Sequence, residues 1–555
     1  MAPRRRAPSQ VDNRSVIEYT SRSMNKLLLA AVTIACLLPF AGKAVHIDDP
    51  LFIWPARHIQ ASPADPYGFP VNWYGYDSPM WRVTQNPPLT SYYLALTAAL
   101  AGWGSLSLHL AMILPAIAVV LGMYALARGL CTQPVHAALL GLFMPVALLS
   151  ATTLMCDVLM LAFWVWAIAL WMKGFEENNH RLLALGGILI AAAALTKYFG
   201  VALIPLLFSY SVIRKRSVGL WAVHFIIPLA FLAAYQWTTE SLYGHGLLSD
   251  AASYADSFRT FQGETLLKGL IGLIFAGGCL AGTIFYIPWL WRGKQLLALL
   301  LIAAAGSALI LALPRLGGLE LRDGDGVRWG VVLQAALFLL GGINLLAVSL
   351  ADLLRRRDAL AWLLFLWVAG TFLFAAFINW TVNGRTLLPF VPAAGILVMR
   401  RLDERSFSLP LLLIPAALIA LLVTWADYSL AGAGRDAAEI IHARYGGAGQ
   451  IWFQGHWGFQ YYMEERGAKP IDAYHQGIRR GDALVVPQNN TNTYRMDTAW
   501  FRLEDRIAVQ PLPWLTTLSG VLGAGFYSDR VGPLPFSAGA VPPEKYLVYV
   551  PKEKK

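Results

Sequence analysis

Apolar stretches long enough to cross a bilayer recur along the first three quarters of the chain. A helix needs about 20 apolar residues to span roughly 30 Å of hydrocarbon. Such a segment has to be helical, because the bilayer offers its backbone no hydrogen-bond partner. The pattern predicts 13 transmembrane helices, near residues 25–44, 106–128, 136–153, 156–173, 181–197, 199–213, 217–237, 267–291, 295–313, 329–352, 359–379, 386–399 and 407–426.

Basic residues between these segments predict the orientation, since cytoplasmic loops are enriched in Lys and Arg. They precede the first segment and recur after every second crossing. We therefore expect residues 1–24 to form a basic cytoplasmic segment and the C-terminus to lie outside. The basic positions are Arg4, Arg5, Arg6, Arg14, Arg22 and Lys26, then Arg128, Lys173, Arg181, Arg214 to Arg216, Arg292, Lys294, Arg355 to Arg357, Arg400, Arg401 and Arg405.

Two segments have an alternative interpretation. Residues 87–104 are apolar, but counting them as a span would invert every later loop, so we expect a helix lying against the outer face of the membrane. The first segment also resembles a cleavable signal peptide, because Met24-Asn25-Lys26 precedes its apolar core. We favour a retained span, since no small-x-small site precedes His46.

The last part of the chain, residues 428–555, is polar and rich in Gly, Pro and aromatic residues. Its pattern predicts helices at 435–445 and 459–466 and strands at 450–454, 483–486 and 546–550.

The predicted fold class is therefore an α-helical polytopic membrane protein with a small C-terminal α/β extracytoplasmic domain. Residues 25–427 form the membrane domain, with long outer loops at 46–105 and 238–266, and residues 428–555 form the outer domain.

Composition supports a membrane protein and excludes other classes. Only 14% of the 555 residues are charged and 57% are hydrophobic, whereas soluble domains are about 25% charged. The net charge of +11 does not indicate a nucleic-acid partner, because most of it lies in the predicted cytoplasmic loops. Four Cys without a CxxC pair exclude a disulfide scaffold and a zinc ribbon.

Polar residues at membrane depth are costly, roughly 2.5–3.5 kcal/mol for an ionisable group, and here they gather on one side. This clustering favours a site that opens outward over a conduction path through the bilayer. The residues at or near the outer helix ends are Asp48, Asp49, Asn86, Asp157, Lys197, Asn383 and Arg385.

The carboxylates each have a catalytic and a structural interpretation. Asp48 and Asp49 are adjacent, so they cannot both face one ligand; one would act on substrate while the other orients it or caps a helix. The alternative is a plain N-cap pair before a helix at 51–60. Asp157 begins a predicted span, where the helix dipole alone also favours an acidic residue.

The cations suit a phosphate. Lys197 lies in a short outer turn, from which a Lys can also snorkel to the membrane surface. Arg385 runs against the positive-inside bias and precedes a helix N-terminus. An Arg together with N-terminal amides makes a phosphate site.

Other residues of the first loop leave more than one interpretation open. His46 and His58 beside the Asp pair suggest a metal, but their spacing fits no known ligand pattern. The sequence requires no cofactor, and a divalent metal stays open without support. Aromatic residues within 65–82 either line a sugar or lipid groove or anchor the loop at the membrane interface; we favour the anchor.

The order of these motifs resembles the GT-C glycosyltransferases. The acidic pair at 48–49, Asn86-Pro-Pro-Leu, Asp157, Leu195-Thr-Lys and Arg385-x-Leu-Leu-Pro are most similar to the dolichyl-phosphate-mannose–protein mannosyltransferase-like superfamily, which includes aminoarabinose transferases. The resemblance covers residues 25 to about 426. It implies a polyprenyl-phosphate sugar donor, an acceptor hydroxyl reached from the outer side, and inversion at the anomeric carbon.

The resemblance also implies roles. Asp48 is the expected base, with Asp49 and Asp157 as the further catalytic carboxylates. Lys197 and Arg385 are expected to bind the donor phosphate. Asn86 stands where aminoarabinose transferases carry Lys, and Thr386 where many members carry Tyr, so we do not expect a lipid A acceptor. The candidate substrate-binding residues are Asn86, Asn383 and His58.

We therefore predict a hexosyl- or pentosyltransferase of the bacterial plasma membrane, with a lipid, polysaccharide or protein acceptor. One alternative is a transporter or flippase of lipids or lipid-linked sugars without chemistry, but no half-to-half similarity of the kind such folds show is present. The other is a membrane scaffold whose outer domain binds a partner.

Overall fold

The computed structural model describes residues 13–257, 265–324, 326–402, 410–447, 449–473 and 477–552. The basic residues Arg4 to Arg6 and Arg405, on which part of the predicted orientation rests, lie outside this set.

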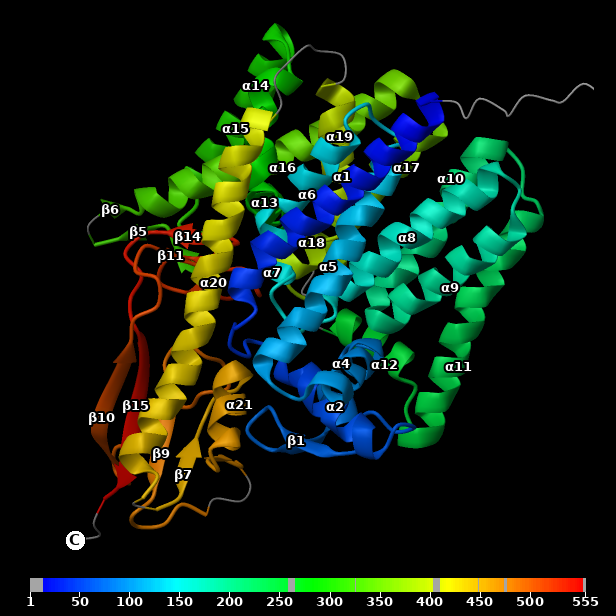
Figure 1. The fold of residues 1–555 in the computed structure, drawn as a ribbon. Helices are drawn as coiled ribbons and strands as arrows, with labels where there is room; N and C mark the ends of the chain where they lie inside the picture. Colours follow the sequence, from blue (N-terminus) through cyan, green and yellow to red (C-terminus); the bar gives the residue numbers. More distant parts are fainter. Residues whose placement is uncertain are drawn as a thin grey trace, which may run out of the picture.

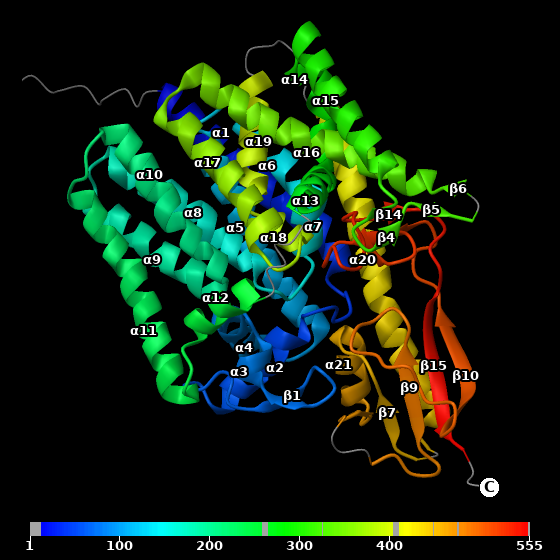
Figure 2. The ribbon, with the colours of Figure 1, turned by 180° about the vertical axis from the view of Figure 1, so that it is seen from behind.

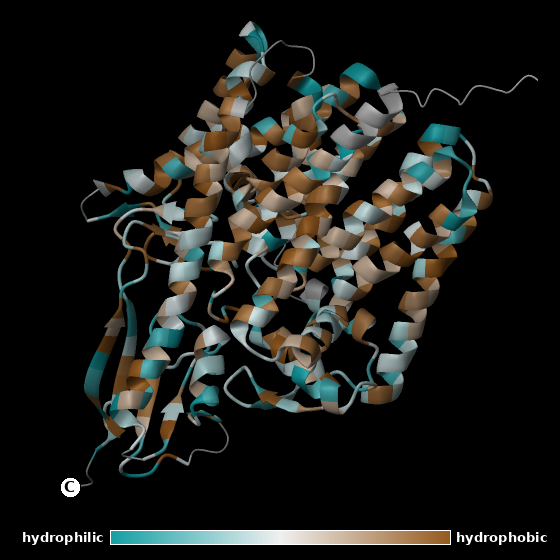
Figure 3. Cartoon of the chain, viewed as in Figure 1, coloured by the Kyte–Doolittle hydropathy of each residue, from teal (hydrophilic) through white to brown (hydrophobic). Residues whose placement is uncertain are grey.

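Helices of mostly apolar surface form a bundle (Figures 1 and 3). Each predicted transmembrane segment overlaps at least one of them. The bundle helices are α1 (Asn13–Leu37), α5 (Ser105–Ala127), α6 (Pro134–Leu142), α7 (Pro145–Ser150), α8 (Asp157–Glu176), α9 (His180–Thr196), α10 (Leu203–Lys215), α11 (Ile226–Tyr243), α13 (Thr265–Cys279), α14 (Ile287–Leu290), α15 (Gly293–Ala312), α16 (Trp329–Arg356), α17 (Ala359–Leu373), α18 (Gly384–Leu387), α19 (Phe390–Leu402) and α20 (Pro410–Tyr445).

Several predicted spans are broken helices. Segment 136–153 divides into α6 and α7 before Pro145, and segment 386–399 is the single turn α18 followed by α19. Among the described residues, nine helices are long and apolar enough to cross a membrane, or ten if the pair bent by 78° at Leu280 counts as one span. The predicted class of polytopic helical membrane protein is confirmed; the number 13 stays a prediction.

The first loop packs as a compact unit at one end of the bundle, which we call the loop face. Residues 87–104 hold a short helix that lies against α2, where Gln60 donates to the Ala95 carbonyl at 2.9 Å. Leu96 and Leu100 remain 61% and 81% exposed, as suits a helix on a membrane surface. The loop elements are α2 (Pro50–Ala61), β1 (Pro70–Asn72), β2 (Asp77–Pro79), α3 (Met80–Val83) and α4 (Leu89–Ala101), and the next loop holds α12 (Leu247–Ser257).

The C-terminal domain is a five-stranded sheet in the order β10-β15-β9-β7-β8, with α20 and α21 packed beside it (Figure 1). The predicted helix at 435–445 is the end of α20, which runs unbroken through residue 428. Strand β10 was not predicted; five of its nine residues are exposed, and Asp505 interrupts its apolar alternation. The elements are β7 (Ile451–Phe453), α21 (Trp457–Glu465), β8 (Lys469–Pro470), β9 (Ala483–Pro487), β10 (Phe501–Val509) and β15 (Glu544–Pro551).

Between β10 and β15 the chain returns to the bundle. We call residues 515–538 the return segment; Figure 2 shows it beside α16 and α20. It packs near two small hairpins that connect α15 to α16. The return segment holds β11 (Leu515–Thr516), β12 (Leu518–Ser519), β13 (Ala524–Gly525) and β14 (Ser537–Ala538), and the hairpins hold β3 (Arg315–Leu316), β4 (Leu319–Glu320), β5 (Arg322–Asp323) and β6 (Gly326–Val327).

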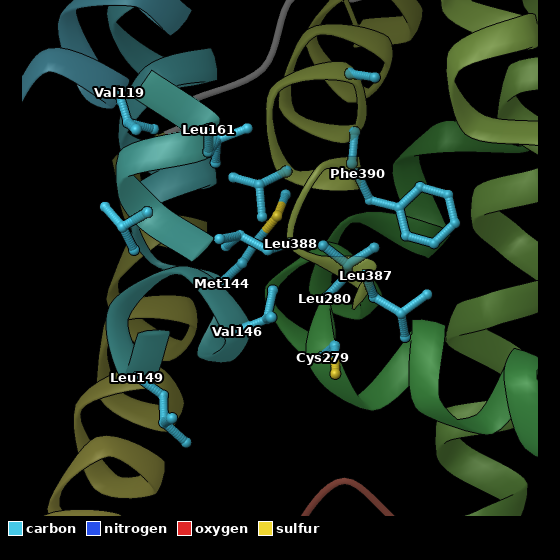
Figure 4. Close-up of a cluster of buried hydrophobic side chains, with 14 of the residues drawn as sticks. Val119, Met144, Val146, Leu149, Leu161, Cys279, Leu280, Leu387, Leu388 and Phe390 are labelled. Carbon is cyan, nitrogen blue, oxygen red and sulfur yellow. The ribbon is translucent and has the colours of Figure 1, made fainter. Parts of the chain in front are cut away.

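The core of the bundle fixes the turn α18. Leu387 and Leu388 are 0% and 1% exposed and lie among Met144, Val146 and Leu280 (Figure 4). Burying such side chains stabilises by about 1.5–3 kcal/mol each. Packing therefore holds a one-turn helix that is too short to be stable by itself.

Candidate active site

Arg385 joins two carboxylates at the loop face. Its Nη1 donates to Oδ2 of Asp48 at 2.8 Å, and its Nε donates to Oδ2 of Asp157 at 2.9 Å. The Arg385 side chain is 12% exposed, whereas that of Asp48 is 34% exposed. Burial alone would lower the pKa of Arg385, but Asp157 and Asp48 raise it above its usual range. The guanidinium is therefore a permanent charge, and Asp48 is the accessible end of the pair.

Lys197 binds the same buried acid. Its Nζ lies 2.6 Å from Oδ1 of Asp157, whose side chain is 1% exposed. Asp157 thus holds one cation with each oxygen, and it does so from the first turn of α8, where the helix dipole favours a carboxylate. Residues far apart in sequence and separately predicted as base, acid and phosphate ligands form one continuous network: Asp48, Arg385, Asp157 and Lys197.

The backbone that presents Asp48 is strained. Ile47 has φ = 44°, a left-handed conformation that β-branched residues avoid and that costs about 1–3 kcal/mol. Its side chain is nevertheless 2% exposed, so core packing holds the backbone in place. Such strain persists where surrounding structure over-determines it, often at functional sites.

Asp49 does not share the environment of its neighbour. Its two oxygens accept the backbone N–H groups of His46 and Leu154, each at 2.9 Å. Asp49 occupies the N-cap position of α2, as the alternative interpretation expected, but its side chain makes no capping hydrogen bond there. Burial raises its pKa to about 7, although Lys43 and the two N–H groups oppose this. These contacts favour a positioning role, and catalysis by Asp49 stays a prediction.

The three candidate substrate-binding residues lie in different environments. The side-chain oxygen of Asn86 accepts from Sγ of Cys156 at 3.6 Å, which places it beside Asp157. Asn383 instead caps α18, accepting from the Thr386 N–H at 2.9 Å. His58 packs on Phe69 with ring centroids 4.9 Å apart, and its buried Nε2 has no hydrogen-bond partner among the described residues. A substrate contact for these residues stays a prediction.

The aromatic residues of the first loop mostly face inward. Tyr67 and Trp73 are 1% and 5% exposed and belong to a cluster inside the loop. A cavity of about 480 Å³ opens beside them, lined by Phe69, Trp81 and Tyr243 among others. None of the residues of the Asp48–Lys197 network lines it. Tyr67 and Trp73 therefore act as loop core, and not as the exposed anchors that we favoured from the sequence.

Sequence reasoning missed a second buried network behind the site. Nζ of Lys43 lies 2.5 Å from Oδ2 of Asp427, with both side chains 0% exposed. Thr517 and Tyr527 donate to Asp427 at 2.6 and 2.8 Å. A Lys inside an apolar predicted span was the available signal, since such a residue needs a partner.

No metal site emerges from the part of the chain that the structure describes. No group of three or more His, Cys, Asp or Glu residues there is arranged to hold an ion. His46 lies 3.8 Å from Asp427, and burial lowers its pKa to about 4. The ring is therefore neutral near pH 7 and packs edge-on against Tyr527.

The fold is a helical membrane bundle that joins carboxylates and cations at one face. Residues 85–237 match the family described as dolichyl-phosphate-mannose-protein mannosyltransferase. This match includes Asn86, Asp157 and Lys197, and it confirms over that segment the resemblance noted from the sequence. The likeness to this family thus rests on residues 85–237 of the 555-residue chain.

Solved structures were also compared with the chain. It is similar to ArnT from Cupriavidus metallidurans bound to undecaprenyl phosphate, with 14% identity, 83% of this chain and 93% of that chain covered, and a TM-score of 0.43. The Archaeoglobus fulgidus oligosaccharyltransferase is 14% identical, with 83% of this chain and 68% of that chain covered and a TM-score of 0.45. The arabinofuranosyltransferase AftD from Mycobacteria is 13% identical, with 95% of this chain and 40% of that chain covered and a TM-score of 0.41. No curated protein matches the chain.

Proposed function

We propose that the protein transfers a hexose or pentose from a polyprenyl-phosphate donor to an acceptor hydroxyl at the outer face of the membrane, with inversion. The observation that carries this proposal is the Asp48–Arg385–Asp157–Lys197 network at the loop face. It combines one partly exposed carboxylate with two cations that a buried acid holds in place.

The chemistry needs these groups and few others. Asp48 removes the proton of the acceptor hydroxyl, whose oxygen attacks the anomeric carbon. The bond from that carbon to the phosphate oxygen breaks, and the polyprenyl phosphate leaves with the electron pair. Arg385 and Lys197 stabilise the charge that develops on this leaving group. A phosphate is a good leaving group, so no general acid is required.

The resting ion pair gives the reaction an order. Without donor, the Arg385 guanidinium is hydrogen-bonded to Oδ2 of Asp48 across 2.8 Å, so this oxygen is engaged and cannot face an acceptor hydroxyl. A donor phosphate competes for the guanidinium and so weakens its hold on Asp48. The Asp48 oxygen then becomes free to take the acceptor proton only when the sugar donor is bound, which limits proton transfer to water.

The surroundings suit a lipid donor and an outward acceptor. The network lies at helix ends of an apolar bundle, beside the loops and the C-terminal domain that the charge pattern assigns to the outer side. We propose a bacterial plasma-membrane location with the N-terminus cytoplasmic. The acceptor is a lipid, a polysaccharide or a protein; Asn86 in place of Lys disfavours an acceptor that requires an extra cation.

Reconstitution tests the proposal. Purified protein in liposomes is given undecaprenyl-phosphate mannose, glucose or arabinose with candidate acceptors, and transfer is followed by mass spectrometry. Asp48→Asn and Arg385→Ala should abolish transfer. Arg315→Ala, which removes an exposed pair with Glu320 in the hairpin β3–β4, is the control and should retain it. Full activity in both site variants would overturn the site assignment, and lipid movement without transfer would favour a flippase.

A further inference from the structure

The loop that precedes Arg385 is held by the C-terminal domain. Val382 donates its N–H to Oδ1 of Asp529 at 3.1 Å, and Asp529 donates its own N–H to the Val382 carbonyl at 2.9 Å. The Thr381 hydroxyl donates to the same Asp529 oxygen. Three hydrogen bonds therefore tie residues 381–382 to the return segment, which is about 150 positions later in the chain.

The residue next to Arg385 is fixed more closely still. Gly384 donates its N–H to the Phe526 carbonyl at 2.7 Å. A Cβ atom at Gly384 would lie only 2.4 Å from the Phe526 ring, and Phe526 is 1% exposed. The ring thus occupies the space that any other residue would need. Gly384 is the first residue of α18, so its position sets where the Arg385 side chain begins.

The return segment is itself anchored to the bundle. Thr517 and Tyr527 donate to the buried Asp427 of α20, and the Ala538 N–H donates to Gln334 of α16 at 2.7 Å. The guanidinium of Arg530 lies 5.0 Å from the ring centroid of Trp380, on the loop that it contacts. The segment therefore links two long helices to the loop of Arg385 without resting on the sheet alone.

We infer that the return segment is a positioning element of the transferase site, which sets the Arg385 guanidinium at the distance that the donor phosphate requires. The turn α18 has four residues and cannot orient a long side chain by itself. The contacts of Asp529 and Phe526 fall on three of the four residues before Arg385, namely Thr381, Val382 and Gly384. Displacing a catalytic group by about 1 Å can cost roughly 100-fold in rate. This inference rests on the proposed function.

The test compares two acids of the same domain. Asp529→Ala removes the two side-chain contacts to residues 381–382 and leaves the backbone one, whereas Asp529→Asn keeps one acceptor oxygen. Asp505→Ala is the matched control, because Asp505 pairs with Arg444 and Tyr445 on the sheet, away from this loop. The readouts are kcat and KM for an undecaprenyl-phosphate sugar, binding of undecaprenyl phosphate, and the fluorine NMR signal of fluorotryptophan at position 380, assigned with Trp380→Phe.

For Asp529→Ala we expect a shifted Trp380 signal, a fall in kcat/KM of roughly 100-fold and weaker binding of undecaprenyl phosphate. Asp529→Asn should recover much of the kcat/KM and of the lipid binding. Asp505→Ala should match the wild type in all three. An unshifted Trp380 signal overturns the inference, and so does a shifted signal with wild-type lipid binding and kinetics. If the wild type itself neither binds the lipid nor transfers sugar, the proposed function fails and the inference falls with it, whatever the Trp380 signal does.

Discussion

Lys43 and Asp427 form an ion pair of 2.5 Å with neither side chain exposed. Lys43 follows the first membrane helix, and Asp427 lies within α20. The Asp427 oxygens also accept from Thr517 and Tyr527, so the carboxylate is fully satisfied. This one acid connects the beginning of the membrane domain, the helix that leaves it, and the return segment.

Breaking this pair should destabilise the protein strongly. Lys43→Met leaves the Asp427 charge buried and uncompensated, which typically costs 3–5 kcal/mol. The double variant Lys43→Met/Asp427→Leu removes both charges and should recover part of the loss. Thermal unfolding in detergent measures the difference. Arg57→Met, which breaks an exposed pair with Glu465, should change stability by less than about 1 kcal/mol, and an equal effect of Arg57→Met and Lys43→Met would contradict this account.

Arg385→Lys should inactivate the protein nearly as well as Arg385→Ala. The guanidinium reaches Asp157 through Nε and Asp48 through Nη1, and a single ammonium cannot reproduce this forked geometry. We expect kcat/KM to fall by about 100-fold or more. Transfer assays with the lipid donor provide the measurement, with Arg315→Lys as the control. Near-wild-type kinetics for Arg385→Lys would show that only charge is needed at this position.

Gly384→Ala should displace α18 and lower activity, because the new Cβ would overlap the Phe526 ring. Phe526→Leu makes room, so the double variant should be more active than Gly384→Ala alone. Gly330→Ala is a suitable control, since its Cβ would meet nothing within 4 Å. The measurement is steady-state kinetics of the wild type, the two single variants, the double variant and the Gly330→Ala control. If Phe526→Leu gives no rescue, the overlap is not the cause of the loss.

Asp49 should make stability depend on pH in the unusual direction for an acid. Its pKa is raised from 3.8 to about 7, with burial as the main cause. Between those values the unfolded chain has lost the proton that the folded protein still binds. Stability therefore falls as pH rises from about 4 to about 7, by on the order of 4 kcal/mol at 1.36 kcal/mol per pKa unit.

The comparison with Asp49→Asn isolates this effect. The variant is neutral at every pH, so relative to wild type it should gain thermal stability between pH 5 and pH 7.5. Burial opposes the shift, but Arg444 lowers the pKa of Asp505. The contribution of Asp505 to stability therefore changes only at pH values below the usual pKa of an Asp. Asp505→Asn should therefore show a constant difference from wild type over the same interval. A constant difference for Asp49→Asn would refute the predicted shift.

The sequence predicted the helical bundle and the members of the site because both depend on local signals. Apolar length locates helices, and charged residues such as Lys197 and Arg385 are conspicuous where charge is costly. The sequence also anticipated that the adjacent acids Asp48 and Asp49 would differ. It could not say which faces Arg385, because this depends on the left-handed Ile47 and on the N–H of Leu154, about 100 residues away.

The contacts of the return segment could not be predicted from the sequence either, because they also join residues that are far apart along the chain. Nothing near Asp529 or Phe526 marks them as neighbours of residues 381–384, since the pairing uses backbone groups and the absence of a side chain at Gly384. Strand β10 was missed because Asp505 interrupts its apolar alternation, close to the irregularity in its pairing with β15. Where long-range packing, and not local pattern, selects the partner, only the folded chain shows it.

The unbroken helix α20 has a mechanical consequence. Its 36 residues extend about 54 Å at 1.5 Å per residue, whereas the hydrocarbon layer is about 30 Å thick. The part of α20 beyond the hydrocarbon layer is therefore a continuous, rigid helix that packs beside the sheet. The sheet must tilt together with the bundle, because the helix has no hinge at residue 428. A swap or deletion of the C-terminal domain that cuts at this residue would therefore also cut a helix that begins in the bundle.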